Sequence, residues 1–76
     1  MFKPGDALRR MYGGEQLIAV VRNEHREGCL DGSTRNDNGW FDWRRQYFKD
    51  GHNTGWELHP NPDEVWAEFV KWKLTN

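Results

Sequence analysis

The first third of the chain alternates polar turns with short apolar runs, a pattern that predicts two antiparallel strands. Lys3-Pro4-Gly5-Asp6 is a turn signature, because Pro fixes φ and Gly tolerates positive φ. Residues 7–12 follow as a strand with imperfect alternation. After Gly13-Gly14, residues 16–22 form a continuous β-branched run, which is typical of a central strand covered on both faces. We therefore expect these two strands to pair antiparallel across the Gly13-Gly14 turn.

The middle of the chain is polar and then abruptly aromatic. Residues 23–28 are polar and predict a turn, and Cys29-Leu30 predict a short third strand. Residues 31–39 are all turn or loop formers, so we expect an exposed loop there. The aromatic residues 40–48 predict one bent strand or a strand pair. Strict alternation would place on one face Phe41, Trp43, Arg45 and Tyr47, and on the other Trp40, Asp42, Arg44 and Phe48. Since so small a domain is expected to use one of these faces as core, some of the aromatic or Arg side chains should lie at the surface.

The last quarter of the chain carries the clearest helix signal. Residues 56–58 predict a final short strand, and the run 61–64 then combines an N-cap Asn, a Pro at the first helical position and two acidic residues. We expect a helix from Pro62 to about Leu74. Its broad apolar stripe comprises Val65, Trp66, Phe69, Val70, Trp72 and Leu74. Packing of both Trp rings on the sheet is the favoured interpretation, and a partly exposed ring that marks a dimer or partner surface is the alternative.

Composition limits how such a domain can be stabilised. The chain has 76 residues, 36% of them hydrophobic, and a mean hydropathy of −1.07, which favours one domain over residues 1–76 with the sheet over about 5–58. A core of this size supplies only about 3–5 kcal/mol of net stability. One cysteine, Cys29, excludes an internal disulfide, so Trp packing, a partner, or both must stabilise the domain. Three tryptophans can account for the core, namely Trp56, Trp66 and Trp72. Trp40 and Trp43 would then not be needed for the core, and are predicted to be surplus to it.

Charge and hydropathy exclude several classes of protein. Eleven Lys and Arg residues against twelve Asp and Glu give a net charge of −1, so the chain as a whole is not steered to nucleic acid. The longest apolar run, residues 17–21, is far shorter than the roughly 20 residues of a membrane span. The N-terminus lacks an apolar signal region, which predicts a cytoplasmic protein with Cys29 reduced.

Catalytic and metal-binding patterns find little support in the sequence. The histidines His25, His52 and His59 fall in predicted loops, with no recognisable nucleophile context. Zinc sites need closely spaced His or Cys pairs, which the chain does not offer. A calcium loop over 31–42 would require an oxygen ligand where Arg35 stands, and a central Gly that is absent. We therefore expect no enzyme activity, no metal and no cofactor.

The opening of the chain resembles a family of small barrels. The run Phe2-Lys3-Pro4-Gly5-Asp6-Ala7-Leu8-Arg9, followed by Gly13-Gly14 and an apolar strand, is similar to the opening of YodC-like SH3-like barrel proteins of bacteria and phages, and to KOW-type barrels. The resemblance covers residues 2–22 and rests on a turn pattern. In the family a Cys stands close to a Trp-Phe-Asp-Gly-like step, whereas here residues 31–39 separate Cys29 from Trp40-Phe41-Asp42. The resemblance implies an SH3-like fold and brings no activity with it.

These observations predict an α+β domain with a small, strongly bent antiparallel sheet of four or five strands, SH3-like, and one C-terminal helix packed on it. The candidate binding residues are the tryptophans and arginines of the aromatic stretch together with three arginines elsewhere: Arg9, Arg10, Arg35, Trp40, Trp43, Arg44 and Arg45. Trp and Arg dominate the binding energy of protein interfaces. They could also stack bases and contact phosphates, an interpretation that ranks below a protein interface. The simplest interpretation, which ranks first, is that the Trp rings pack in the core and the Arg side chains are solvated.

The preferred function is that of a small, non-enzymatic protein-binding factor with an accessory or regulatory role. A phage or mobile-element protein that binds and modulates a host complex, for example as an inhibitor, would have this compactness and this lack of catalytic groups. The alternative is a nucleic-acid-binding barrel that uses the Arg and aromatic surface; the near-neutral charge counts against it. A homodimer through the C-terminal helix stays open.

Overall fold

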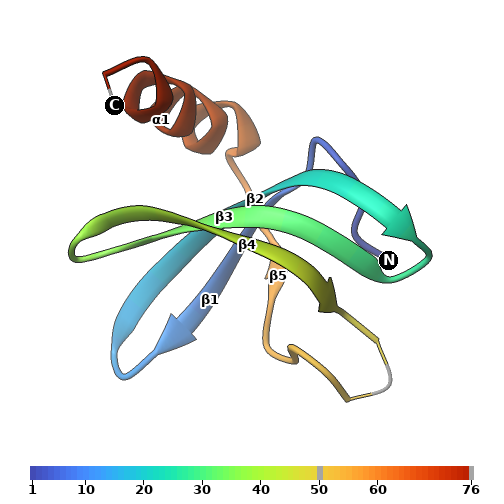
Figure 1. Ribbon diagram of the computed structural model, residues 1–76. Helices are drawn as coiled ribbons and strands as arrows, with labels where there is room; N and C mark the ends of the chain where they lie inside the picture. The colour runs from blue at the N-terminus through green and yellow to red at the C-terminus, as the bar shows by residue number, and fades with distance from the viewer. Residues whose placement is uncertain (50, 76) are drawn as a thin grey trace.

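Five strands and one helix make up the described part of the chain, residues 1–49 and 51–75 of a computed structural model (Figure 1). The elements are β1 (Ala7–Tyr12), β2 (Glu15–Arg26), β3 (Cys29–Asn36), β4 (Gly39–Tyr47), β5 (Glu57–Leu58) and α1 (Pro62–Thr75). The strands form one antiparallel sheet in the order β4-β3-β2-β1-β5, and this sheet is not closed. The predicted α+β class, with an antiparallel sheet and a C-terminal helix, is confirmed.

The first two strands pair as the apolar pattern predicts. β1 and β2 are antiparallel neighbours across Gly13-Gly14, and β2 lies in the middle of the sheet. Because side chains alternate along a strand, Ile18 and Val20 face α1, whereas Ala19 and Val21 face the other side. All four side chains are buried. The prediction of a central strand covered on both faces is therefore confirmed.

Two apolar clusters, one on each face of the sheet, share the core. The cluster under α1 contains Ala7, Ile18, Val20, Trp40, Val65 and Phe69. The cluster on the opposite face contains Leu8, Ala19, Val21 and Leu30, with Phe2, Trp43, Phe48 and Trp56 packed against it. Figure 1 shows α1 on one side of the sheet and the segment that joins β4 to β5 on the other. This segment and the N-terminus cover the second face, so both faces carry core side chains.

The loop predicted over 31–39 is wrong, because most of these residues belong to β3, which lies between β2 and β4. Asp31, Ser33 and Thr34 are buried although all three have polar side chains. Each of the three side chains has a hydrogen-bond partner; Ser33 Oγ, for example, donates to Asp42 Oδ1 at 2.5 Å. Burial of polar groups is tolerated when they are paired in this way. The third strand is consequently longer than predicted, and most of the polar stretch 23–28 extends β2.

Neither Trp40 nor Trp43 is left over from the core, which corrects the prediction that they are surplus. Trp40 is 7% exposed and meets Phe69 of α1 edge to face, with ring centroids 5.2 Å apart. Trp43 is half-buried on the opposite face, 5.4 Å from the ring of Phe48. The expectation of a single core face fails because the sheet has a cover on each side.

A bulge in β4 limits the predicted alternation. Gly32 pairs with Trp43, but Leu30 pairs with Gln46, so β4 has one more residue than β3 between these pairs. Arg45, within the bulge, adopts φ 51°. The predicted assignment of side chains to the two faces is therefore correct up to Trp43 and wrong beyond the bulge. Beyond the bulge Tyr47 pairs with Cys29, and Phe48 joins the cluster that contains Trp43.

The C-terminal helix extends over Pro62–Thr75, one residue beyond the predicted end. Val65 and Phe69 are buried beneath it, and Trp66 and Trp72 pack against the same cluster. The indole N–H of Trp66 also donates to the Gly5 carbonyl oxygen at 2.7 Å. Packing of both Trp rings on the sheet is thus confirmed. Within residues 1–49 and 51–75, no helix has the length and apolar character that crossing a membrane would demand.

Candidate functional site

The seven predicted binding residues are all described, and they do not form one surface. Arg9 Nε lies 2.7 Å from Glu57 Oε1, and Arg35 Nη1 lies 2.5 Å from Glu68 Oε1 of α1. Each guanidinium is thereby engaged by a carboxylate within the domain. Trp40 is inside the core under α1. These three residues are accordingly occupied by the fold itself.

The other four predicted residues lie at two places. Arg44 and Arg45 are exposed at the β4 bulge. Arg10 and Trp43 line one pocket on the sheet face opposite α1. The structure therefore brings Arg10 and Trp43 together in this pocket, and Arg35 and Trp40 together in another pocket beside α1. It places the remaining three arginines elsewhere.

We call the concave site that contains Arg10 and Trp43 the aromatic pocket, and it has a volume of about 270 Å³. Its principal lining side chains are Arg10, Leu17, Phe41, Trp43, Phe48 and Trp56. They come from β1, β2 and β4 and from the segment that precedes β5. Apolar lining with a few polar groups is typical of binding pockets, and this volume lies just below the roughly 300–1,000 Å³ of small-molecule sites. Its size suits one inserted side chain.

The walls of the aromatic pocket are held in place by contacts between β3 and β4. The indole Nε1–H of Trp43 donates to Thr34 Oγ1 at 2.8 Å. One side of the same ring lies tilted against Phe48, and another part lies over Gly32, where a Cβ atom would be 2.4 Å from Cζ2. Phe41, two residues before Trp43 on β4, remains 47% exposed. The pocket thus combines one fixed ring and one ring open to solvent.

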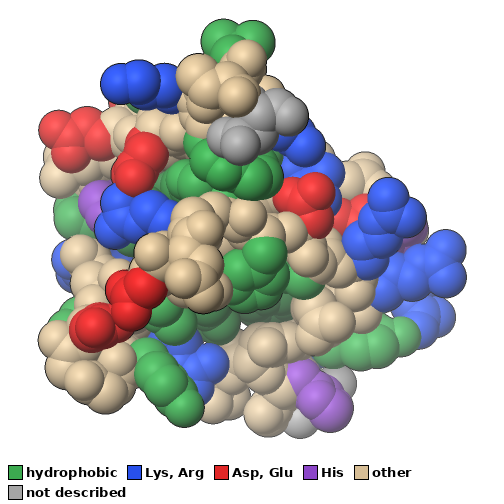
Figure 2. Space-filling view, turned by 60° about the vertical axis from the view of Figure 1, so that its left-hand side comes forward, with side chains coloured by type: hydrophobic (Ala, Val, Ile, Leu, Met, Phe, Trp, Pro, Cys, Tyr) green, Lys and Arg blue, Asp and Glu red, His purple; other side chains and the backbone are tan. Residues whose placement is uncertain are grey.

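Arg10 contributes the charge of the aromatic pocket. It lies on the same face of β1 as Leu8, and its side chain passes beside Gly55. Among the residues that the structure describes, no ion pair involves Arg10. A cation without an internal carboxylate is available to a partner's acidic or polar group. In the space-filling view, hydrophobic side chains reach the surface at several places between polar ones (Figure 2).

Sequence reasoning missed three aromatic members of the pocket. Phe41 shares the face of Trp43 in the simple alternation, which is a signal that could have added it to the candidate residues. Phe48 was predicted on the opposite face, because the bulge is not visible in the sequence. Trp56 was assigned to the core and lines the pocket as well as the second cluster.

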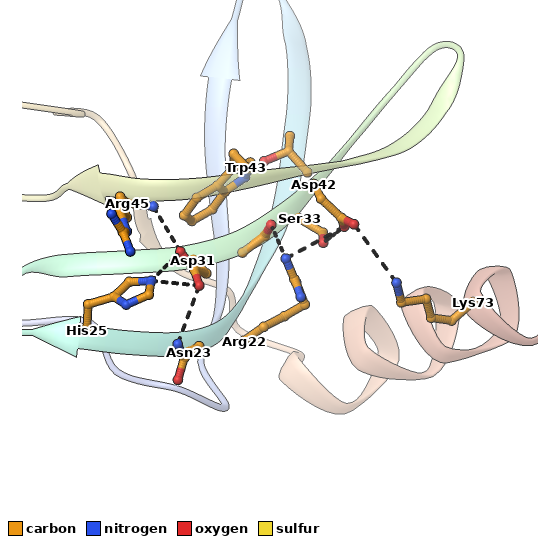
Figure 3. A network of polar contacts seen from close by, with 11 residues as sticks. Arg22, Asn23, His25, Asp31, Ser33, Asp42, Trp43, Arg45 and Lys73 are labelled. Carbon is orange, nitrogen blue, oxygen red and sulfur yellow. Dashed lines mark hydrogen bonds and ion pairs between the residues drawn. The ribbon is translucent and has the colours of Figure 1, made fainter.

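A polar network covers the α1 face of β2, β3 and β4 (Figure 3). At one end, Asp31 accepts hydrogen bonds from the backbone N–H of Arg45 at 2.9 Å, from His25 Nε2 at 2.9 Å and from the Asn23 amide at 3.4 Å. These contacts, first of all the Arg45 N–H, lower the pKa of Asp31 to about 2. The carboxylate therefore anchors the β4 bulge.

The other end of the network reaches the helix. Ser33 donates to Asp42, and this hydrogen bond is the largest cause that lowers the pKa of the Asp42 carboxyl. Arg22 Nη2 lies 3.8 Å from Asp42, and Lys73 Nζ of α1 lies 3.9 Å from the same carboxylate. Figure 3 shows these contacts running from Lys73 through Asp42 to Ser33 and Arg22, beside the separate group around Asp31. The network ties β2, β3, β4 and α1 together.

Metal-ligating side chains do not cluster within residues 1–49 and 51–75. These residues contain no group of three or more His, Cys, Asp or Glu side chains placed to hold a metal ion. Cys29 is buried. Comparison with protein-family models, with curated proteins and with solved structures finds no match to this chain. The YodC-like resemblance therefore stays a prediction, and function has to be argued from the site.

Proposed function

We propose that this protein is a non-enzymatic protein-binding factor, with an accessory or regulatory role, and that the aromatic pocket receives an apolar side chain of its partner. The observation that carries the proposal is the exposed ring of Phe41 beside the fixed ring of Trp43. Interface anchors are aromatic and Arg side chains clustered around a pocket. The volume of about 270 Å³ supports a single inserted side chain.

Arg10 supports the same function from the rim of the pocket. Because no ion pair in the described chain involves it, a carboxylate or carbonyl of the partner could be held there without displacing an internal ion pair. The fixed geometry of Trp43 lowers the conformational entropy lost on binding. The partner segment we propose thus presents an apolar side chain next to an acidic or polar group.

Several finer features belong to this proposal. The factor would act in the cytoplasm, and a phage or mobile-element protein that inhibits a host complex fits such a small binding module. A homodimer through α1 would use Val70 and Leu74, which are exposed large apolar residues of that helix. Nucleic-acid binding is less well supported, because Arg9 and Arg35 face carboxylates and Trp40 is buried.

The test compares matched variants in affinity capture from host lysate followed by mass spectrometry. We expect Phe41→Ala and Arg10→Gln to lose a protein that the unmodified chain captures. Met11→Ala is the control, since Met11 neighbours Arg10 on β1 and is exposed on the other face. Equal capture by all three variants would exclude the pocket.

Nucleic acid is tested separately by mobility shift with single-stranded and duplex probes. The proposal predicts no shift at low salt. A shift that weakens steeply as salt rises would instead support a nucleic-acid function, because counterion release drives such binding.

A further inference from the structure

A second hollow, outside the aromatic pocket, gathers positive charge. This basic hollow has a volume of about 380 Å³ and is lined by His25, Arg26, Cys29, Arg45 and Tyr47. It lies on the α1 face of the sheet, since Leu30 faces the opposite side and side chains alternate along β3. Cys29, next to Leu30, is the register partner of Arg26 and Tyr47. Nothing in the proposed protein-binding function uses it.

Two irregularities of the sheet place the arginines around this hollow. A shift in the β2–β3 register lies between Glu24 and Arg26, and the β4 bulge contains Arg45. The backbone N–H of Arg45 is fixed by Asp31, with φ at 51°, a conformation that non-glycine residues adopt rarely. Figure 3 shows the Arg45 side chain on the same side of the sheet as His25. The side chain is therefore directed by an unusual backbone.

Arg26 is held over Tyr47. Its Nη2 donates to the Tyr47 hydroxyl, and its guanidinium carbon lies 5.4 Å from the centre of the ring. This contact orients the guanidinium and leaves further N–H donors of its five-donor fork for another acceptor. A preoriented guanidinium loses less freedom when it binds an anion.

The charges around the hollow are not balanced within the domain. The Asp31 carboxylate binds the β4 bulge, and its two oxygens already accept hydrogen bonds from His25, Asn23 and the Arg45 backbone. Among residues 1–49 and 51–75, no ion pair joins Arg26 or Arg45 to a carboxylate. Two like charges that line one hollow repel each other, and an anion between them would relieve that repulsion.

We propose that the basic hollow binds a phosphate group, with the guanidinium groups of Arg26 and Arg45 and the hydroxyl of Tyr47 as its donors. Arginine is suited to this ligand because its planar fork matches phosphate oxygens bidentately. His25 and Asp31 position the bulge and are not ligands. Cys29 forms the floor of the hollow and is buried. The phosphate can be a free ion or the monoester group of a larger molecule.

The experiment is an NMR titration of the amide signals with inorganic phosphate, O-phosphoserine and glycerol 3-phosphate at constant ionic strength. The buffer is set about one and a half pH units above the second phosphate pKa of about 6, so that the ligand is doubly charged. We expect saturable shifts centred on Arg26, Arg45 and Tyr47. Equal affinity for the three probes indicates a free ion as ligand, and tighter binding of one monoester indicates that kind of source. Shifts without saturation, or spread over the whole basic surface, would overturn the proposal.

Matched variants sharpen the result. Arg26→Gln and Arg45→Gln should each bind about tenfold more weakly, the loss typical of one charge-assisted hydrogen bond. Arg9→Gln, whose guanidinium faces Glu57, should bind as the unmodified chain does. Unchanged affinity in both hollow variants refutes the site. Should either variant fail to fold, Tyr47→Phe and the shift map of the unmodified chain decide, because the variant keeps the ring and loses one proposed donor.

Discussion

The indole of Trp43 occupies the space that any side chain at Gly32 would need. A Cβ atom at Gly32 would lie 2.4 Å from Cζ2 of the ring and 2.4 Å from the Val20 carbonyl oxygen on β2. The two residues are register partners between β3 and β4. Close approach of this kind requires glycine in a strand interior. The same contact fixes one wall of the aromatic pocket, so this pair of residues both stabilises the fold and shapes the candidate site.

Gly32→Ala should be strongly destabilising. The added methyl group would have to displace either the Trp43 ring or the β2 backbone, and overpacking of a well-packed core costs about 1–3 kcal/mol or more. Urea unfolding measures the change in the free energy of unfolding. Gly13→Ala is the control, because Gly13 has φ 58° and open space around it, so its cost is backbone strain of roughly 1–2 kcal/mol. A Gly32→Ala cost below that of the control would contradict the packing argument.

Trp40→Ala should unfold the domain. Truncation of a buried Trp costs about 3–5 kcal/mol, which equals the net stability of about 3–5 kcal/mol expected of a core this small. The ring is 7% exposed and contacts Phe69, so its loss removes an aromatic contact between the sheet and α1. Circular dichroism and thermal melting of the variant measure the effect. The control is Phe41→Ala, in which a half-exposed ring is removed and the melting transition should persist. A folded Trp40→Ala protein would show that the core under α1 is not needed.

Local patterns were sufficient to predict the elements whose residues all favour one structure. β1, β2 and α1 have turn signals at their ends and a consistent apolar period, and their positions agree with the prediction within a few residues, apart from the polar C-terminal end of β2. β3 could not be predicted in this way. Ser33 and Thr34 are stable in a central strand because Asp42 and Trp43 of another strand pair with them. Both partners lie on β4, so the residues of β3 alone do not reveal them.

The candidate site was predictable to a smaller extent. Arg10 and Trp43 were recognised, because Arg and Trp are typical of binding surfaces. The two faces of the aromatic stretch could not be assigned throughout, since the bulge lies at two arginines, where nothing signals a positive φ. Arg45 adopts it because the Asp31 carboxylate binds its backbone N–H. The decisive contact is again tertiary, which is why Phe48 was placed on the wrong face.

Acid should weaken the fold through Asp31. Its pKa is lowered to about 2 from an ordinary 3.8, so the ionised form stabilises the folded state. A lowered pKa gives a contribution that is complete above the unfolded value and is lost as pH falls through the folded value. Stability due to Asp31 should therefore decline between about pH 4 and about pH 2.

The measurement is the free energy of unfolding in urea over that range. Asp31→Asn should show a shallower decline with acid, since the neutral amide cannot titrate. Asp37→Asn, at the exposed turn between β3 and β4, is the matched control and should retain the full slope. An unchanged slope in Asp31→Asn would mean that the contacts with Arg45, His25 and Asn23 do not hold the carboxylate in its charged form.

The exposed side of α1 makes the proposed homodimer testable. Val70 is 47% and Leu74 is 82% exposed, and residues four apart lie on the same side of a helix. If two copies pair through these residues, the melting temperature should rise with protein concentration, because dimerisation stabilises the folded state by mass action. Leu74→Lys should abolish that rise, whereas Met11→Lys, at an exposed apolar residue of β1, should retain it. A melting temperature that stays constant over a hundredfold range of concentration, together with a monomer in sedimentation, rejects the homodimer and leaves α1 with the packing role that Val65 and Phe69 give it.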